Sequence, residues 1–366
     1  MQLLLPLLAS PARLHTPRQK HGDGHDTRTG SQKAIIRPYI IDQSYKNKVN
    51  KLLTISPSPH IHTTRTVSGI MWHVVIALVP ALACALWVFG IGAAIVTVTS
   101  VLACIITEYI ITRFMLGQPP TIANGSAILT GLLLAFNLPS NLPVWIVIIG
   151  AAVAIGIGKM AFGGLGCNIF NPAITGRVFL LLSFPAQMTS WPLPGENTWR
   201  YLDATTGATT LGAMKTGEVI PDTIDLWQSA LGMTGGSLGE VGAIALVIGG
   251  IYLIAARIIT WHIPVSILAA VALMSLCIGA DVPLQLLSGG LLLGAIFMAT
   301  DYVTSPMTRT GMVIYGICIG IITVIIRQWG SYPEGVSFAI LIMNGFTPLI
   351  NRYVKPRKFG ERRAAK

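Results

Sequence analysis

The sequence predicts an all-α polytopic membrane protein with about ten transmembrane helices, arranged in two duplicated halves that contain broken helices. The first observation behind this prediction is composition. Of the 366 residues, 52% are hydrophobic and only 11% are charged, and the mean hydropathy is +0.67. A soluble domain carries about 25% charged residues. The composition therefore excludes a soluble globule, a disordered chain and a small disulfide-linked scaffold.

The second observation is where the basic residues lie. The formal net charge is +11, and most of it comes from the two ends. Residues 1–65 carry ten Lys and Arg against three Asp and Glu, and residues 352–366 carry seven against Glu361 alone. Basic flanks around apolar spans indicate cytoplasmic segments. We therefore expect both termini in the cytoplasm and an even number of crossings, and no nucleic acid is needed to explain the charge.

The third observation is a series of apolar spans that divides the chain. The spans lie at about 70–91, 92–113, 121–138, 143–161, 172–184, 239–258, 263–280, 283–300, 311–326 and 335–351. The chain is accordingly divided into a basic, disordered cytoplasmic extension (1–51), a first membrane repeat (52–184), an extracytoplasmic loop (185–238), a second membrane repeat (239–351) and a basic cytoplasmic tail (352–366).

Two spans, 121–138 and 172–184, are short and interrupted by Asn, Gly and Pro. Interrupted helices in matching positions of two halves indicate a buried ligand site. Two pairs of segments also resemble each other: 125–139 with 285–301, and 170–178 with 304–313. These similarities predict an internal duplication over about 70–190 and 240–350.

The extracytoplasmic loop contains a run of small and hydroxyl residues, Asp203-Ala204-Thr205-Thr206-Gly207-Ala208-Thr209-Thr210. Taken alone, such a run is typical of a turn or a helix N-cap. A threonine next to small residues such as Gly and Ala is also sterically open, so an enzyme could modify its hydroxyl.

A second motif, residues 159–173, reads KMAFGGLGCNIFNPA. A phosphate-binding P-loop is rejected because no Lys-Ser/Thr follows the glycines. One interpretation is structural: Asn171 caps the next helix and Pro172 occupies its first turn. The other interpretation is functional: the helix is interrupted in the middle of the membrane, and the amide side chains at this interruption face a neutral heteroaromatic ring.

Ionisable residues inside apolar spans are costly and commonly functional. Glu108 and Asp301 are candidates for a Na⁺ or H⁺ path, although an interfacial position beside Arg113 is an alternative for Glu108. Arg177 and Arg327 are either interfacial anchors or flavin neighbours. No metal site is expected, because neither the histidines (His60, His62, His73) nor the five scattered cysteines have ligand spacing.

These motifs resemble a known family. TTGAT, preceded by Asp203, is similar to the flavinylation motif, whose last threonine is joined to FMN through a phosphoester. Together with SPSPHIHT at 56–63 and GCNIFNPAITGR at 166–177, it resembles the RnfD component of the Rnf ion-translocating electron transport complex, in the NqrB/RnfD family. The related NqrB component of Na⁺-translocating NADH:quinone reductase stays an alternative, as does a urea-channel-like solute transporter.

The resemblance implies the cofactors and their residues. FMN would be attached covalently to Thr209 by a separate flavin transferase, which makes the chain a phosphoprotein. Thr210 is chemically equivalent, so chemistry alone does not choose between the two. A non-covalent riboflavin would lie beside Asn168 and Asn171.

The resemblance also implies a flavin-carrying subunit of a redox-driven ion pump in the bacterial inner membrane. It would relay electrons between ferredoxin and NAD, coupled to Na⁺ or H⁺ translocation. The chain has no dinucleotide fingerprint and no cysteine cluster, so no catalytic residue is assigned and the subunit is not catalytically complete alone. Its partners would be the other Rnf complex subunits (A, B, C, E and G), the flavin transferase and membrane lipid. Which ion moves, and whether this subunit carries it, stay open.

Overall fold

A computed structural model describes most of the chain from Thr66 onward. The described residues are 66–118, 122–194, 201–202, 204–207, 209, 211–212, 215, 231–232, 235–330, 332 and 334–355. The predicted extension 1–51, the SPSPHIHT segment, Asp203, Thr210 and most of the tail lie outside them.

The first half is a series of five helical segments. They are α1 (Val67–Phe89), α2 (Ile91–Ile110) continuing into the π-helical η2 (Ile111–Met115), α3 (Ser126–Phe136) after the short η3 (Ile122–Asn124), α4 (Val144–Gly156) followed by η4 (Met160–Phe162), and α5 (Pro172–Ser183). A short α6 (Pro185–Met188) and the strands β1 (Trp191–Pro192) and β2 (Thr206–Gly207) follow.

The second half also contains five helical segments. They are α9 (Ala243–Ala255), α10 (His262–Ile278), a broken segment made of α11 (Val282–Leu287), α12 (Leu291–Leu293) and the π-helical η5 (Gly294–Met298), then α13 (Arg309–Trp329) and α14 (Val336–Tyr353). The break follows from Gly289 and Gly290, whose φ angles of 71° and 64° lie in the left-handed region that glycine adopts most readily.

The predicted fold class is confirmed. Each of the ten apolar spans coincides with a helical segment. Four helices in the described residues are long and apolar enough to cross a membrane by length and composition: Val67–Phe89, Ile91–Met115, Val144–Phe162 and Arg309–Trp329. Side-chain caps begin α1 and α13, because Thr66 accepts a hydrogen bond from the Gly69 N–H and Thr308 accepts one from the Gly311 N–H.

The two halves repeat the same packing order. In the first half α2 packs against α3 and α4, and α4 packs against α5; in the second, α10 packs against α11 and α13, and α13 packs against α14. The halves meet where α1 packs on α9 and α5 on α14. Among the described residues, each half thus has five main helical segments that pack in the same order.

This order corrects one detail of the expected duplication. Residues 125–139 and 285–301 both contain the third segment of their half, as expected. Residues 170–178, however, begin the fifth segment of the first half, whereas 304–313 lead into the fourth segment of the second. Their similarity reflects a shared helix start with Pro and a capping side chain, not equivalent positions in the two halves.

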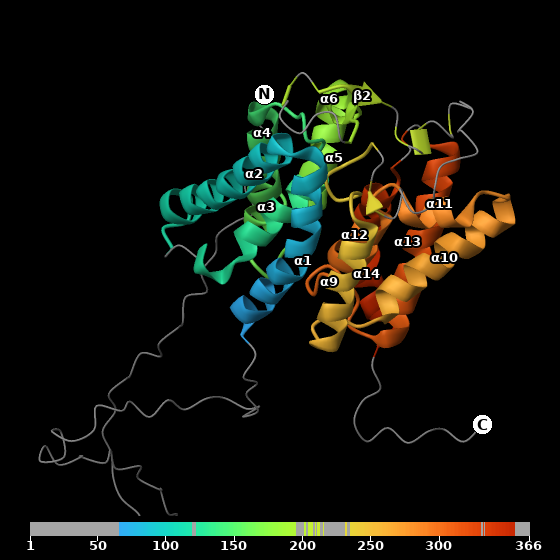
Figure 1. Ribbon diagram of the computed structural model, residues 1–366. Coiled ribbons are helices and arrows are strands. Elements are labelled where there is room, and N and C mark those ends of the chain that lie inside the picture. Colours follow the sequence, from blue (N-terminus) through green and yellow to red (C-terminus); the bar gives the residue numbers. More distant parts are fainter. Residues whose placement is uncertain are drawn as a thin grey trace, which may run out of the picture. The chain divides into compact units, whose positions relative to one another are not determined.

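The ends of the helices define two ends of the molecule. The first turn of α1 and the last turn of α14 lie at one end, the lower end in Figure 1, whereas α6 and β2 lie at the other. At the upper end β1 pairs with β2 in antiparallel register, with Trp191 opposite Gly207. This pairing places the start of the threonine-rich motif at the end opposite the first turn of α1.

Candidate functional site

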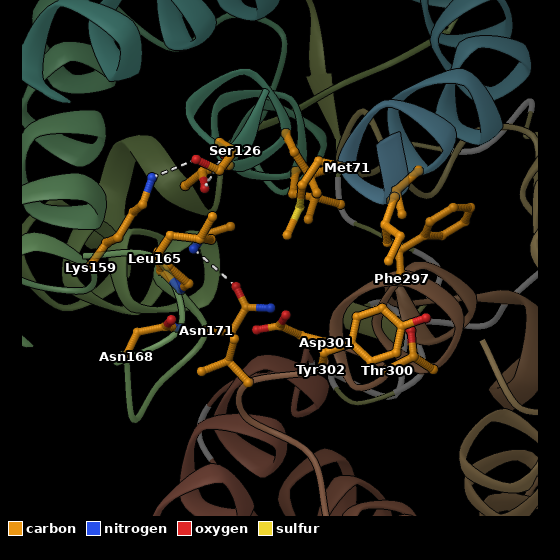
Figure 2. Close-up of a pocket in the computed structure, with 18 of the residues that line it drawn as sticks. Met71, Ser126, Lys159, Leu165, Asn168, Asn171, Phe297, Thr300, Asp301 and Tyr302 are labelled. Carbon is orange, nitrogen blue, oxygen red and sulfur yellow. Dashed lines mark hydrogen bonds between the residues drawn. The ribbon is translucent and has the colours of Figure 1, made fainter. Parts of the chain in front are cut away.

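A pocket lies between the two halves at the lower end (Figure 2). The first half contributes α1, α3, the connection between α4 and α5, and the first turn of α5; the second contributes the end of α9 and the segment after α12. About 780 Å³ lies between the atoms of the pocket, its mouth included. The lining comprises Ile70, Met71, Val74, Ser126, Leu129, Thr130, Leu133, Lys159, Leu165, Asn168, Asn171, Pro172, Ala173, Leu253, Ile258, Ile259, Phe297, Thr300, Asp301, Tyr302 and Val303.

The pocket combines apolar walls with a few polar groups. Met71 and Phe297 are among the apolar side chains, while Lys159, Ser126 and Asn168 lie together on the side opposite Phe297 in Figure 2. Mostly apolar walls with a small number of convergent polar groups are typical of a small-molecule site.

Asn171 ties the pocket wall together. Its Oδ1 accepts hydrogen bonds from the N–H groups of Ala173 and Ile174, at 3.0 and 3.4 Å, so it caps α5 as the structural interpretation expected. Its Nδ2 donates to the Met298 carbonyl of the second half at 3.2 Å. Asn171 therefore serves as a helix cap and as a link between the halves, at the edge of the pocket.

Asn168 lies on the turn that follows three glycines, Gly163, Gly164 and Gly166, whose φ angles are 111°, 93° and 92°. This positive-φ turn returns the chain from α4 to α5 and brings Asn168 to the pocket. The Asn168 side chain is buried and its Nδ2 donates to the Phe170 carbonyl at 3.0 Å. The glycines therefore place an amide group at the ligand-facing turn.

Glu108 is buried within the protein and forms an ion pair with Lys159. Its carboxylate accepts from the Lys159 ammonium at 2.6 Å, and the two side chains are 1% and 3% exposed. Lys159 also donates to the Ser126 hydroxyl at 2.8 Å. Arg113, by contrast, is exposed on η2. The pair lies at the wall of the pocket because Lys159 lines it.

Asp301 also lines the pocket and lies three residues after Met298, the last residue of η5. Its carboxylate accepts a hydrogen bond from the Thr304 hydroxyl at 3.3 Å and others from the N–H groups of Tyr302 and Val303. Among the described residues, no Lys, Arg or His nitrogen lies within 4.0 Å of the Asp301 carboxylate, so Asp301 forms no ion pair with them. Four of the five predicted site residues, Glu108, Asn168, Asn171 and Asp301, thus gather at or beside one pocket.

Thr209 lies apart from this pocket, in the loop after β2. It is 4% exposed, and its hydroxyl accepts a hydrogen bond from the Gly212 N–H at 3.0 Å. Tyr201, in the same loop, donates its hydroxyl to the Leu142 carbonyl, and burial raises its pKa. The bond from Tyr201 ties this part of the loop to the residue two positions before α4.

Sequence reasoning missed two features of the site. The first is Lys159 as the partner of Glu108, although a lysine inside the apolar span 143–161 carries the same signal as an acid inside one. The second is the partner of Arg177, which forms a buried ion pair with Glu334 and donates to Asn137 Oδ1 at 2.7 Å. Arg177 and Arg327 are each 4% exposed, so both guanidinium groups lie inside the protein.

Comparison with known proteins gives consistent matches over most of the chain. Residues 54–360 match the model of the NQR2, RnfD, RnfE family. The D component of the Na(+)-translocating ferredoxin:NAD(+) oxidoreductase complex of Acetobacterium woodii is 47% identical, covering 86% of this chain and 96% of its own length. The proton-translocating counterpart of Clostridium ljungdahlii is 43% identical over 85% of this chain and 97% of its own. The D component of the ion-translocating oxidoreductase complex of Stutzerimonas stutzeri is 41% identical, covering 81% of this chain and 92% of its own length.

Proposed function

Because this chain belongs to the NQR2, RnfD, RnfE family, we propose that it is the flavin-carrying membrane subunit of an Rnf-type pump. It is a subunit of an ion-translocating oxidoreductase. The complex relays electrons between ferredoxin and NAD and couples them to Na⁺ or H⁺ translocation, as the names of the relatives state for their own complexes. The other Rnf complex subunits (A, B, C, E and G) are the expected partners, in the inner membrane with both termini cytoplasmic.

The residues around the proposed flavin positions fit such groups. At the pocket between the halves, apolar side chains can cover the faces of a planar ring, while Asn168, Ser126 and Thr300 offer polar groups at its edge. In the loop, Thr209 offers a hydroxyl in a segment of small residues. A bound flavin supplies one- and two-electron transfer; the chain supplies position, exclusion of water and local charge.

The single observation that carries the proposal is the gathering of Glu108, Asn168, Asn171 and Asp301 around one pocket. A ring-binding pair of amides therefore adjoins the two acids proposed for the ion path. Lys159 balances the charge of Glu108 and adjoins the pocket, so a change of charge in the pocket would act directly on this ion pair.

The covalent flavin is tested by producing the full chain beside its flavin transferase. Denaturing electrophoresis is followed by in-gel fluorescence, with mass spectrometry of the peptide that contains Thr209. We expect a fluorescent band that Thr209→Val abolishes and Thr210→Val retains. An unmodified peptide from the wild-type chain would overturn the proposal, and loss of fluorescence in Thr210→Val alone would move the attachment to Thr210.

A further inference from the structure

A second pocket lies at the upper end, beside the segment that carries Thr209. It contains about 690 Å³ between atoms, mouth included, and its lining includes Leu211, Lys215, Asp281, Gln285, Arg327 and Gln328. Leu211 and Lys215 follow Thr209 in the chain, and the others belong to the ends of α10, α11 and α13. The segment after Thr209 therefore forms one wall of this pocket.

Arg327 is unusual among the buried cations of the described residues. Three such cations are 2–4% exposed: Lys159, Arg177 and Arg327. Lys159 faces Glu108 and Arg177 faces Glu334, whereas no carboxylate in the described part of the chain lies within 4.0 Å of an Arg327 nitrogen. Burying a charge without a countercharge in contact is expensive.

The hydrogen bonds of Arg327 go to neutral oxygens. Its Nη1 donates to the Gln285 carbonyl at 2.6 Å and to Gln285 Oε1 at 2.9 Å, and its Nη2 donates to the Ser288 carbonyl at 2.8 Å. Its Nε is buried and has no hydrogen-bond acceptor among the residues that the structure describes. The charge of Glu240 acts on it only at longer range and is shared with Arg177. The guanidinium is therefore held in place by neutral acceptors, and no carboxylate of the described residues is in contact with it.

The Thr209 segment runs directly past this guanidinium. A Cβ placed on Gly289 would lie 2.5 Å from Leu211 Cδ1 and 2.6 Å from Arg327 Nη2, so both side chains touch the same glycine. Lys215, four residues after Leu211 in the sequence, adds a second positive charge to the pocket and donates to the Gly330 carbonyl. Arg327 and Lys215 thus both line the pocket in which Leu211, two residues after Thr209, meets the ends of α11 and α13.

We infer that Arg327, assisted by Lys215, binds the phosphodiester that links the flavin to the chain. This inference rests on the proposed attachment at Thr209. A phosphodiester carries one negative charge and strong acceptor oxygens, and arginine is well suited to bind phosphate. Arg327 acts as a positioning residue: its charge is neutralised when the flavin is attached, and the linkage is held against the ends of α11 and α13.

Flavinylation should therefore stabilise the protein through Arg327. We would heat native membranes containing the full chain, produced with or without the flavin transferase, and measure the temperature at which half of the chain aggregates. In the wild type, attachment should raise this midpoint by at least roughly 2 °C. Arg327→Gln should remove most of the increment, Arg327→Lys should keep part of it because the charge remains, and Lys215→Gln should reduce it less.

The matched control is Arg309→Gln, which removes an exposed arginine at the other end of α13 and should leave the increment unchanged. An equal increment in wild type and in both Arg327 variants, each fluorescent, overturns the inference while the proposed function stands. Absence of a fluorescent band in the wild type overturns the proposed function instead. Stabilisation that depends on Arg327 and on added anionic lipid, but not on the transferase, assigns the site to a lipid phosphate and also overturns the inference.

Discussion

At the scale of single residues, the site depends on charges buried in pairs. Lys159 and Glu108 lie 51 positions apart in the chain and are joined at 2.6 Å. Removing one member of a buried pair leaves the other charge in a medium that solvates it poorly, which costs about 3–5 kcal/mol. The ion pair is therefore both a structural link from α2 to the turn after α4 and part of the pocket wall.

Lys159→Met should lower the midpoint of thermal aggregation strongly, because the Glu108 carboxylate loses its ammonium partner. Adding Glu108→Gln removes the buried charge and should restore part of the loss. Both variants and the double variant are compared with wild type in native membranes. A double variant as unstable as the sum of the two single changes would show that the side chains do not act as a pair.

The sequence predicted the structural roles of some residues but not the partners of others. The cap at Asn171 was predictable because Asn followed by Pro marks a helix start. The partners of Glu108 and Arg177 were not, since each partner is distant in sequence and no local period connects them. That Arg327 has no carboxylate in contact among the described residues could be recognised only once those neighbours were placed.

At the scale of elements, close packing depends on small residues where helices cross. Gly176 of α5 faces α4 so closely that a Cβ there would lie 2.8 Å from the Gly150 carbonyl and 2.9 Å from the Ala154 Cβ. Gly156, near the end of α4, has more room, because the nearest atom to its Cβ would be Ile111 Cδ1 at 3.6 Å. Small residues at such crossings let helix backbones approach in membranes.

Gly176→Ala should therefore destabilise the protein by about 1–3 kcal/mol, the usual effect of overpacking. Gly156→Ala, the matched control, should be neutral or slightly stabilising, since alanine is the better helix former. Thermal aggregation in membranes measures both. If the two variants behaved alike, the close approach of α4 and α5 would not be a determinant of stability.

Helix positions were predictable because apolar runs near membrane length dominate the sequence. The finer course of the third segment in each half was not. Gly289 and Gly290 interrupt 283–300 into α11, α12 and η5, and η3 precedes α3. Whether glycine interrupts a helix or merely sits in it depends on tertiary contacts, which hydropathy does not record.

At the scale of the whole molecule, the arrangement of the ends predicts a topology. Met307, 86% exposed, precedes α13 at the lower end, and Leu202, 59% exposed, lies in the loop at the upper end. The basic segments at both termini favour a cytoplasmic lower end. The loop that contains Leu202 should then face the outside.

In a cysteine-free background, Leu202→Cys should react with a membrane-impermeant maleimide in intact cells. Met307→Cys should react only after the membrane is permeabilised. Labelling is quantified by the shift of the band in electrophoresis. The opposite pattern would reverse the orientation, and labelling of both sites in intact cells would contradict the placement of the two ends on different sides.

The pocket at the lower end has walls from both halves, joined across it by the hydrogen bond from Asn171 to the Met298 carbonyl. Any tilting of one half against the other would widen or narrow the space between those walls. A molecule held there would consequently favour one angle over others, and that angle would in turn set how tightly the molecule is held. Binding of a molecule in the pocket and the angle between the two halves are therefore thermodynamically coupled.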